Sequence, residues 1–187
     1  MVGNVGFVSR SELFSEIKNR LATAEKTLII SVDGPAGAGK TTLANELVDV
    51  FANTDVVHMD DLYRGWALTL GPNLTRELLS IIEQINESGS ASYAKFDWHS
   101  NQIGDEIKIS KPALLILEGV GSAQSALDEL VDLKVWLEVP IELGLARVLE
   151  RDGQEFAEAM AEFIEQQESH FTEQKTKQRA DFHLSGN

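Results

Sequence analysis

Four residues in the stretch LIISVDGPAGAGKTTLANEL, residues 28–47, have the types and spacing needed to hold phosphate groups. Gly34, Gly39, Lys40 and Thr41 fill every fixed position of G-x-x-x-x-G-K-[ST], the P-loop. The glycines let the backbone aim N–H groups at phosphate oxygens, the lysine adds a mobile and catalytic positive charge, and the threonine hydroxyl is a ligand for Mg²⁺. The pattern predicts a nucleoside triphosphate site made by Gly34, Pro35, Ala36, Gly37, Ala38, Gly39, Lys40, Thr41 and Thr42.

Three carboxylates follow apolar runs and are candidates for phosphoryl-transfer chemistry. Glu118 ends the run LLILE, and Asp60 and Asp61 follow the run DVVHM. At the carboxyl end of a central strand, Glu118 is expected to join Thr41 at the metal, although a strand-end carboxylate also occurs by chance. Adjacent acids are also common in solvated turns, but ring-stacking and anion-pairing side chains follow these two: Tyr63, Arg64 and Trp66. The combination predicts the site of the phosphoryl acceptor.

Two arginines are candidates for stabilising charge on the transferred group. Arg147 and Arg151 are four residues apart, so they share one face of a predicted helix next to the dipeptide DG. This dipeptide ends the predicted helix, and a lid over residues 140–155 is expected to hinge there. The alternative is a solvated pair that forms surface ion pairs with neighbouring acids, Glu142 and Glu150.

A second aromatic group lies in the stretch FDWHS. Phe96 and Trp98 alternate around Asp97, so in an extended strand their rings share one face and offer a stacking wall to a base. The same two rings are equally compatible with a place in the core. The four histidines have no metal-ligand spacing and are expected to be structural: His58, His99, His170 and His183.

The elements that position these residues alternate between strands and helices. A β-branched-rich run precedes the P-loop and a helical pattern follows it, and the runs PALLILEGV and LKVWLEVP have the continuous apolar character of strands buried on both faces. Helices are expected within residues 1–26 and over about 74–87, 122–130, 141–151 and 154–178, a hairpin-like excursion near 91–110, and a last strand at ADFHLSG. This order predicts one domain, residues 1–187, with the three-layer α/β fold of P-loop NTPases: a parallel sheet of about five strands flanked by helices.

Charge and composition narrow the range of partners. The formal net charge is −14, which disfavours nucleic acid and anionic membranes because both are bound by clustered Lys and Arg. There is no cysteine, which excludes disulfides and thiolate metal sites. The chain has no signal-peptide pattern and no apolar run of membrane-spanning length, so a cytoplasmic protein is expected. The oligomeric state stays open.

The motifs DGPAGAGKTTLA, VHMDDLYRGW, FDWHS, LILEGV and ARVLERDG, in this order, resemble the uridine kinase-like family of P-loop nucleoside kinases over residues 28–185. The resemblance implies an ATP- and Mg²⁺-dependent kinase that phosphorylates a hydroxyl of a nucleoside-like small molecule. It further implies that Asp60 is the general base and that acceptor-binding residues are Tyr63, Phe96 and Asp97, with Arg64 and Trp98 beside them. Glu118 matches the metal-linked acid. Arg147 and Arg151 match lid arginines, so the resemblance implies that these two residues are catalytic. FDWHSNQ lacks the arginine that usually follows in uridine kinases, so pyrimidine recognition stays open.

Two other classes of protein share a P-loop. A regulatory GTPase requires D-x-x-G after a strand and [NT]-K-x-D for guanine, and neither pattern is present. An ATP-binding module or ATPase without a small-molecule acceptor stays open, and in it the cluster from Asp60 to Trp66 is a protein contact. Three cations near the C-terminus are compatible with phosphate or adenine contacts and equally with a polar helix end: Lys175, Lys177 and Arg179.

Overall fold

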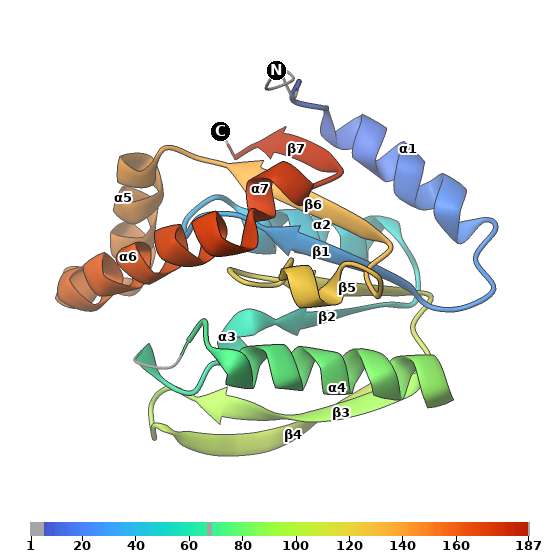
Figure 1. Cartoon of the computed structure of the whole chain (residues 1–187), viewed down its shortest axis with the longest axis horizontal. Coiled ribbons are helices and arrows are strands. Elements are labelled where there is room, and N and C mark those ends of the chain that lie inside the picture. The colour runs from blue at the N-terminus through green and yellow to red at the C-terminus, as the bar shows by residue number, and fades with distance from the viewer. Residues whose placement is uncertain (1–5, 67–68, 187) are drawn as a thin grey trace.

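A five-stranded parallel sheet forms the centre of the computed structural model, which describes residues 6–66 and 69–186. Its strands are β1 Leu28–Asp33, β2 Thr54–His58, β5 Leu114–Glu118, β6 Leu133–Glu138 and β7 Phe182–Ser185. They lie in the order β2-β5-β1-β6-β7, and every neighbouring pair is parallel. All carboxyl ends therefore meet at one edge, on the left of Figure 1. The predicted fold class and strand number are confirmed.

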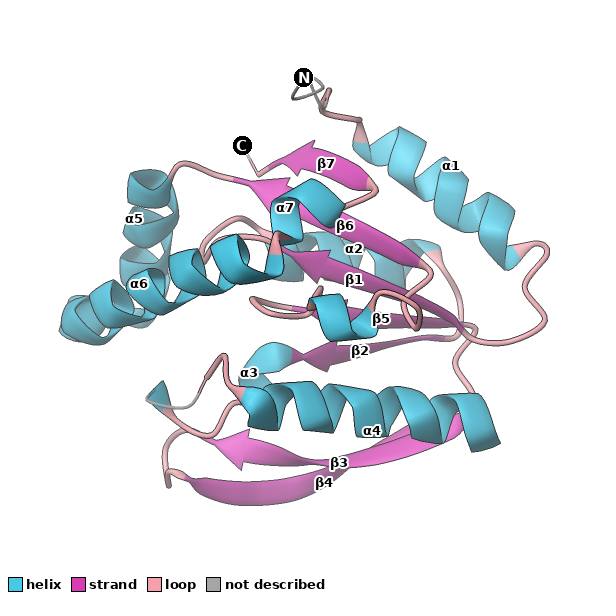
Figure 2. Ribbon diagram, viewed as in Figure 1, coloured by secondary structure: helices cyan, strands magenta, loops and turns pink. Residues whose placement is uncertain are grey.

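Helices cover both faces of this sheet, which explains why every residue of β1 and β5 is buried. Helices α1 (Arg10–Leu21) and α2 (Lys40–Val50) share one apolar core with the sheet. The opposite face packs against α3 (Met59–Leu62), α4 (Pro72–Ser88) and α6 (Ala157–Gln174), with α5 (Ile141–Asp152) and the short α7 (Thr176–Arg179) beside α6. Figures 1 and 2 show α6 and α7 in front of the sheet and α2 behind it.

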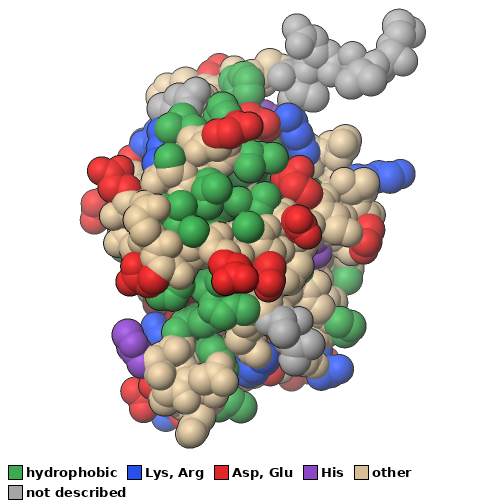
Figure 3. All heavy atoms as spheres, turned by 90° about the vertical axis from the view of Figure 1, so that its left-hand side faces the viewer, with side chains coloured by type: hydrophobic (Ala, Val, Ile, Leu, Met, Phe, Trp, Pro, Cys, Tyr) green, Lys and Arg blue, Asp and Glu red, His purple; other side chains and the backbone are tan. Residues whose placement is uncertain are grey.

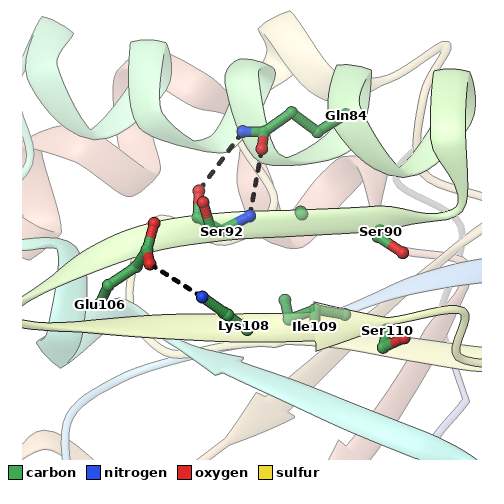
Figure 4. Close-up of a pocket in the computed structure, with 8 residues that line it drawn as sticks. Gln84, Ser90, Ser92, Glu106, Lys108, Ile109 and Ser110 are labelled. Atoms are coloured by element: carbon green, nitrogen blue, oxygen red, sulfur yellow. Dashed lines mark hydrogen bonds and ion pairs between the residues drawn. The ribbon is translucent and has the colours of Figure 1, made fainter.

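The predicted hairpin is present as the antiparallel pair β3 (Ser90–Asp97) and β4 (Gln102–Ser110). It packs against α4 through a reciprocal contact in which the side chain of Gln84 accepts from the backbone N–H of Ser92 at 3.1 Å and donates to its carbonyl at 3.4 Å (Figure 4). The hairpin carries Phe96, Asp97 and Trp98 toward the carboxyl edge of the main sheet, where Trp98 bonds to the segment after β2.

Two predicted helices differ from the structure. The helix expected over 122–130 is wrong, because the region holds only a short 3₁₀ turn, Ser125–Leu127. Side chains of Asp33 and Arg179 bond to backbone groups of Ala123 and hold that segment as a loop. The long helix expected over 154–178 is divided into the turn Gln154–Phe156, α6 and α7, and Lys175 interrupts it with a φ of 51°.

The other boundaries agree within a few residues. Helix α1 begins after Ser9, which forms a capping box with Glu12. Residues 1–5 of the range 1–26 lie outside the described residues. Helices α4 and α5 and strand β7 fall where they are predicted.

Candidate functional site: the phosphate loop and the carboxyl edge of the sheet

The phosphate loop connects β1 to α2 and turns sharply at its end. Gly39 lies just before α2 with a φ of 89°, a conformation that favours glycine, and no side chain caps the first N–H groups of the helix. Lys40 folds back over the loop, and its Nζ donates to the carbonyls of Gly34 at 2.9 Å and Pro35 at 2.8 Å. Burial lowers the pKa of Lys40, and the charge of Glu118 works in the opposite direction. The loop presents N–H groups and one lysine, which suits an anionic ligand.

Helix α5 packs directly on the outside of this loop. A Cβ atom built on Gly144 would lie 2.3 Å from the carbonyl oxygen of Ala36, so only glycine allows the helix so close. Arg147, one turn further along, donates through one nitrogen to the carbonyls of Gly37 at 3.2 Å and Gly186 at 2.7 Å. The structure therefore places Arg147 against the backbone of the loop.

Both predicted metal-linked residues, Thr41 and Glu118, meet beside the loop. The hydroxyl of Thr41 donates to Glu118 Oε1 at 3.2 Å, although the two residues are 77 positions apart in the chain. The other carboxylate oxygen, Oε2, lies 2.7 Å from Nδ1 of His58, and this hydrogen bond raises the pKa of the histidine. His58 and Glu118 are register neighbours in β2 and β5, so the adjacent strands bring them together.

The donor set at this position fits Mg²⁺. A carboxylate and a hydroxyl are hard oxygen ligands, and Mg²⁺ in such sites usually takes one or two protein ligands and completes its shell with phosphates and water. Within the residues that the structure describes, there is no cluster of three or more His, Cys, Asp or Glu that could hold a metal.

Asp33, the last residue of β1, was not among the predicted site residues. Its side chain is fully buried and accepts hydrogen bonds from the backbone N–H groups of Gly34 at 2.7 Å, Gly121 at 3.1 Å and Ala123 at 2.9 Å. Burial raises its pKa to about 6, while these N–H groups and the charge of Lys40 act to lower it. The signal in the sequence was an acid directly before a P-loop, at the end of a strand predicted to be buried.

The adjacent acids Asp60 and Asp61 have different surroundings. Asp60 keeps an exposed surface at the site, but the protein atoms crowded around its carboxylate still desolvate it. This desolvation, followed by the charge of Glu118, raises its pKa, while Lys40 acts to lower it. Asp61 points toward the hairpin, is buried, and pairs with Lys95 Nζ at 2.9 Å. Of these two acids, Asp60 interacts electrostatically with Lys40 of the phosphate loop. Asp61 instead connects α3 to β3 through its ion pair with Lys95.

An aromatic wall, here defined as Tyr63, Trp66, Phe96, Trp98, Phe156 and Phe163, lies next to Asp60. Trp98 donates its indole N–H to the carbonyl of Asp60 at 2.9 Å, and its ring centre lies 5.2 Å from that of Trp66. Three of the rings remain between 36% and 38% exposed: Trp66, Trp98 and Phe156. Figure 3 views the carboxyl-edge side, where apolar side chains gather and acidic ones lie around them.

The other predicted acceptor residues have partners within the protein. Phe96 is buried, and the Tyr63 hydroxyl donates to the carbonyl of Val120 at 2.7 Å. Asp97 accepts from the N–H of His99 and the hydroxyl of Ser100, and the Ser100 bond chiefly lowers its pKa. These contacts make Asp97 a turn residue at the tip of the hairpin in this conformation.

The remaining cations are also engaged. Arg64 pairs with Glu77 at 3.1 Å, but its buried Nη1 has no hydrogen-bond partner within the described residues. Arg151 forms two 2.6 Å hydrogen bonds to Asp152, and these bonds are the main cause of its raised pKa. The negative charges of Asp60 and Glu118 also raise the pKa of Arg151.

Two of the three cations near the C-terminus, Lys175 and Lys177, line the same cavity, and Arg179 is not among its lining residues. Lys177 pairs with Glu138 at 2.7 Å, and Arg179 binds Asp128 and the carbonyl of Ala123. This cavity of about 710 Å³ lies between α6 and the end of β6 and reaches the phosphate loop only at Pro35. A smaller cavity of about 490 Å³ lies between α4 and the hairpin and touches none of the predicted site residues (Figure 4).

Among the described helices, none is both long and apolar enough to cross a membrane.

A phosphate loop between β1 and α2, at the carboxyl edge of a parallel sheet, is the arrangement of P-loop NTPases, and the relatives of this chain place it among the P-loop kinases. Residues 70–182, more than half of the chain, match the model of the phosphoribulokinase / uridine kinase family, and the chain belongs to this family. It is 25% identical over 156 residues to a uridine kinase of Borrelia duttonii (74% of this chain and 73% of that protein). It is 26% identical over 156 residues to a cytidylate kinase of Methanococcoides burtonii (83% and 81%).

Solved structures agree on the fold. The structure described as "a Possible Uridine Kinase from Bacillus stearothermophilus" superposes with a TM-score of 0.62 at 19% identity, over 92% of this chain and 99% of that one. The predicted resemblance to uridine kinase-like P-loop kinases is confirmed by the family match.

Proposed function

We propose that this kinase transfers the γ-phosphoryl group of ATP, with Mg²⁺, to a hydroxyl of a nucleoside-like acceptor. One observation carries the proposal: Asp60 shares its electrostatic surroundings with Lys40 and Glu118, while its backbone is bonded to Trp98 of the aromatic wall. A carboxylate between a phosphate loop and a set of partly exposed rings is in the position from which a base would take the proton of an acceptor hydroxyl.

The transfer needs little covalent help from the protein, so positioning and charge are the main contributions. As the acceptor oxygen bonds to the γ-phosphorus, the bond to the β–γ bridging oxygen breaks and ADP leaves. Asp60 accepts the hydroxyl proton in our proposal, and Lys40 exchanges its carbonyl partners for phosphate oxygens. Thr41 and Glu118 would hold Mg²⁺, which screens the triphosphate charge.

The two arginines are proposed to have unequal roles. Arg151 interacts electrostatically with Asp60 and Glu118. We therefore propose that Arg151 releases Asp152 and stabilises the transferred phosphoryl group. Arg147 is already bonded to Gly37 and Gly186, so it would hold α5 on the loop. We propose that residues 140–155 form the lid of a single domain, with movement concentrated near Gly153, beyond the part packed on the loop.

The acceptor is proposed to be uncharged, as a nucleoside is and a nucleotide is not. Arg64 and Lys95, the cations next to the wall, are paired with Glu77 and Asp61, and these carboxylates reduce the positive charge that a phosphate group would meet there. The Nη1 of Arg64, which is buried and has no partner within the described residues, would instead donate to a neutral carbonyl or hydroxyl oxygen of an acceptor that reaches it. The exposed rings of the wall suit a flat base.

A panel of acceptors tests the function. ADP formation is measured with uridine, cytidine, adenosine, CMP and simple alcohols against an acceptor-free control. Asp60→Asn should lower kcat by about two orders of magnitude or more with little change in ADP affinity. Asp105→Asn, an exposed acid on β4, is the matched control and should leave kcat unchanged.

The alternative is an ATP-binding module or ATPase without a small-molecule acceptor. It predicts ADP formation that no acceptor accelerates and equal, small effects of both substitutions. Asp61→Asn is unsuitable as the control because it would break the ion pair by which the buried Asp61 holds Lys95.

A further inference from the structure

The segment that follows Glu118, residues 119–123, is tied back to β1 at several points. The N–H of Gly119 donates to the carbonyl of Val32 at 3.1 Å. The N–H groups of Gly121 and Ala123 both donate to the carboxylate of Asp33. The chain leaving the metal-linked acid is therefore fastened to the strand that leads into the phosphate loop.

The same carboxylate also binds the first residue of the phosphate loop. Asp33 Oδ1 accepts from the N–H of Gly34 at 2.7 Å, and Gly121 approaches both oxygens, at 3.2 Å and 3.1 Å. One fully buried side chain thus joins the start of the phosphate loop to the segment after Glu118. No other side chain in the described residues bonds to both segments.

We propose that Asp33 is a positioning residue that fixes Glu118 relative to Thr41, so that the two meet in the geometry that Mg²⁺-nucleotide binding needs. Thr41 follows the loop that Asp33 holds at its start, and Glu118 precedes the segment that Asp33 holds at its other end. The 3.2 Å contact between Thr41 and Glu118 closes this ring of contacts. The inference rests on the proposed nucleotide site.

The arrangement requires a carboxylate rather than an amide. An ionised carboxyl group offers only acceptors, and all its partners here are N–H donors. Asparagine has nearly the same shape but would turn an NH₂ group toward one of these donors. At least one buried N–H would lose its partner, and the two segments would move apart.

The test compares Asp33→Asn with Asp132→Asn. Asp132 is a matched control because its carboxylate accepts from the N–H of Ile29 at 2.8 Å, near the opposite end of the same strand and away from the site. ADP affinity is measured with Mg²⁺ and with EDTA. Asp33→Asn should weaken binding of Mg²⁺-ADP by about tenfold or more, the usual effect of removing a partner that orients a metal ligand. Metal-free ADP binding should change less than about threefold, and Asp132→Asn should change neither affinity.

Equal losses with and without Mg²⁺, or no loss, would overturn the inference. If the unaltered protein fails to bind Mg²⁺-ADP at all, the proposed function fails instead, and the two failures are distinguishable.

A second measurement covers the case in which Asp33→Asn does not fold. In the unaltered chain, amide hydrogen exchange is followed during titration with Mg²⁺-ADP. Residues 119–123 should gain protection together with residues 34–42, at the same ligand concentration, because one side chain joins them. Protection confined to the phosphate loop would contradict the inference.

Discussion

The packing of α5 on the phosphate loop makes Gly144→Ala an informative substitution. Two effects oppose each other there. Alanine is favoured over glycine inside a helix by about 1 kcal/mol. The added Cβ, however, would lie 2.3 Å from the carbonyl oxygen of Ala36 and 3.2 Å from Cγ1 of Val139. Because Ala36 meets it with backbone and not with a flexible side-chain end, the helix or the loop has to move.

The size of that movement sets the expected cost. An ordinary contact needs about 1 Å more than the 2.3 Å available, and overpacking of this kind usually costs about 1–3 kcal/mol. The steric term therefore exceeds the helix-propensity gain, and we expect a net loss of about 1 kcal/mol. For a chain of 187 residues this corresponds to a fall in Tm of about 2–4 °C. The displaced loop should also bind ADP more weakly.

Thermal unfolding with and without Mg²⁺-ADP measures both effects. Ala146→Gly, at an exposed position of the same helix, is the control for helix propensity. It should cost about 1 kcal/mol and leave the ADP-induced rise in Tm unchanged. The reasoning is refuted if Gly144→Ala raises Tm and keeps the full ADP-induced shift.

Further predictions concern the site itself. Lys40→Ala should abolish the ATP-induced rise in Tm while the protein still unfolds cooperatively, and an unchanged rise would argue against the phosphate loop. Glu118→Gln should weaken Mg²⁺-ATP binding more than metal-free ATP binding, and equal losses in a calorimetric titration would make Glu118 purely structural. The raised pKa of Asp33, about 6 against 3.8, means that the folded state binds its proton more tightly than the unfolded state. Its contribution to stability is therefore greatest below pH 4 and is lost as pH rises to about 6, by up to roughly 3 kcal/mol. The difference in unfolding free energy between the unaltered protein and Asp33→Asn should change by this amount between pH 4 and 7, and a constant difference would contradict the assignment.

The local signals in the sequence were enough for the phosphate loop, the strands and the hairpin. A P-loop is a contiguous pattern, and buried strands are contiguous apolar runs, so neither needs knowledge of distant contacts. The helix expected over 122–130 failed because distant side chains, Asp33 and Arg179, hold that backbone in a loop. Helix propensity depends on the residues within the segment itself, so it gives no information about contacts with distant side chains.

The distinct surroundings of Asp60 and Asp61 could not be predicted either. In the sequence they are equivalent neighbours, and only the packing of β3 against α3 brings Lys95 to Asp61 and leaves Asp60 at the site. For the same reason Arg147 and Arg151 were given one role, although α5 places one on the loop backbone and the other beside Asp152.

The most direct test of the proposed activity identifies the phosphorylated product. The protein is incubated with Mg²⁺-ATP and an equimolar mixture of uridine, cytidine and CMP, and the products are analysed by mass spectrometry. The proposal of an uncharged acceptor predicts that a nucleoside gains one phosphoryl group in step with ADP formation and that CMP is not converted to CDP. It also predicts that Asp60→Asn forms the product about two orders of magnitude more slowly. Formation of CDP, or of ADP and inorganic phosphate with no phosphorylated nucleoside, would contradict it.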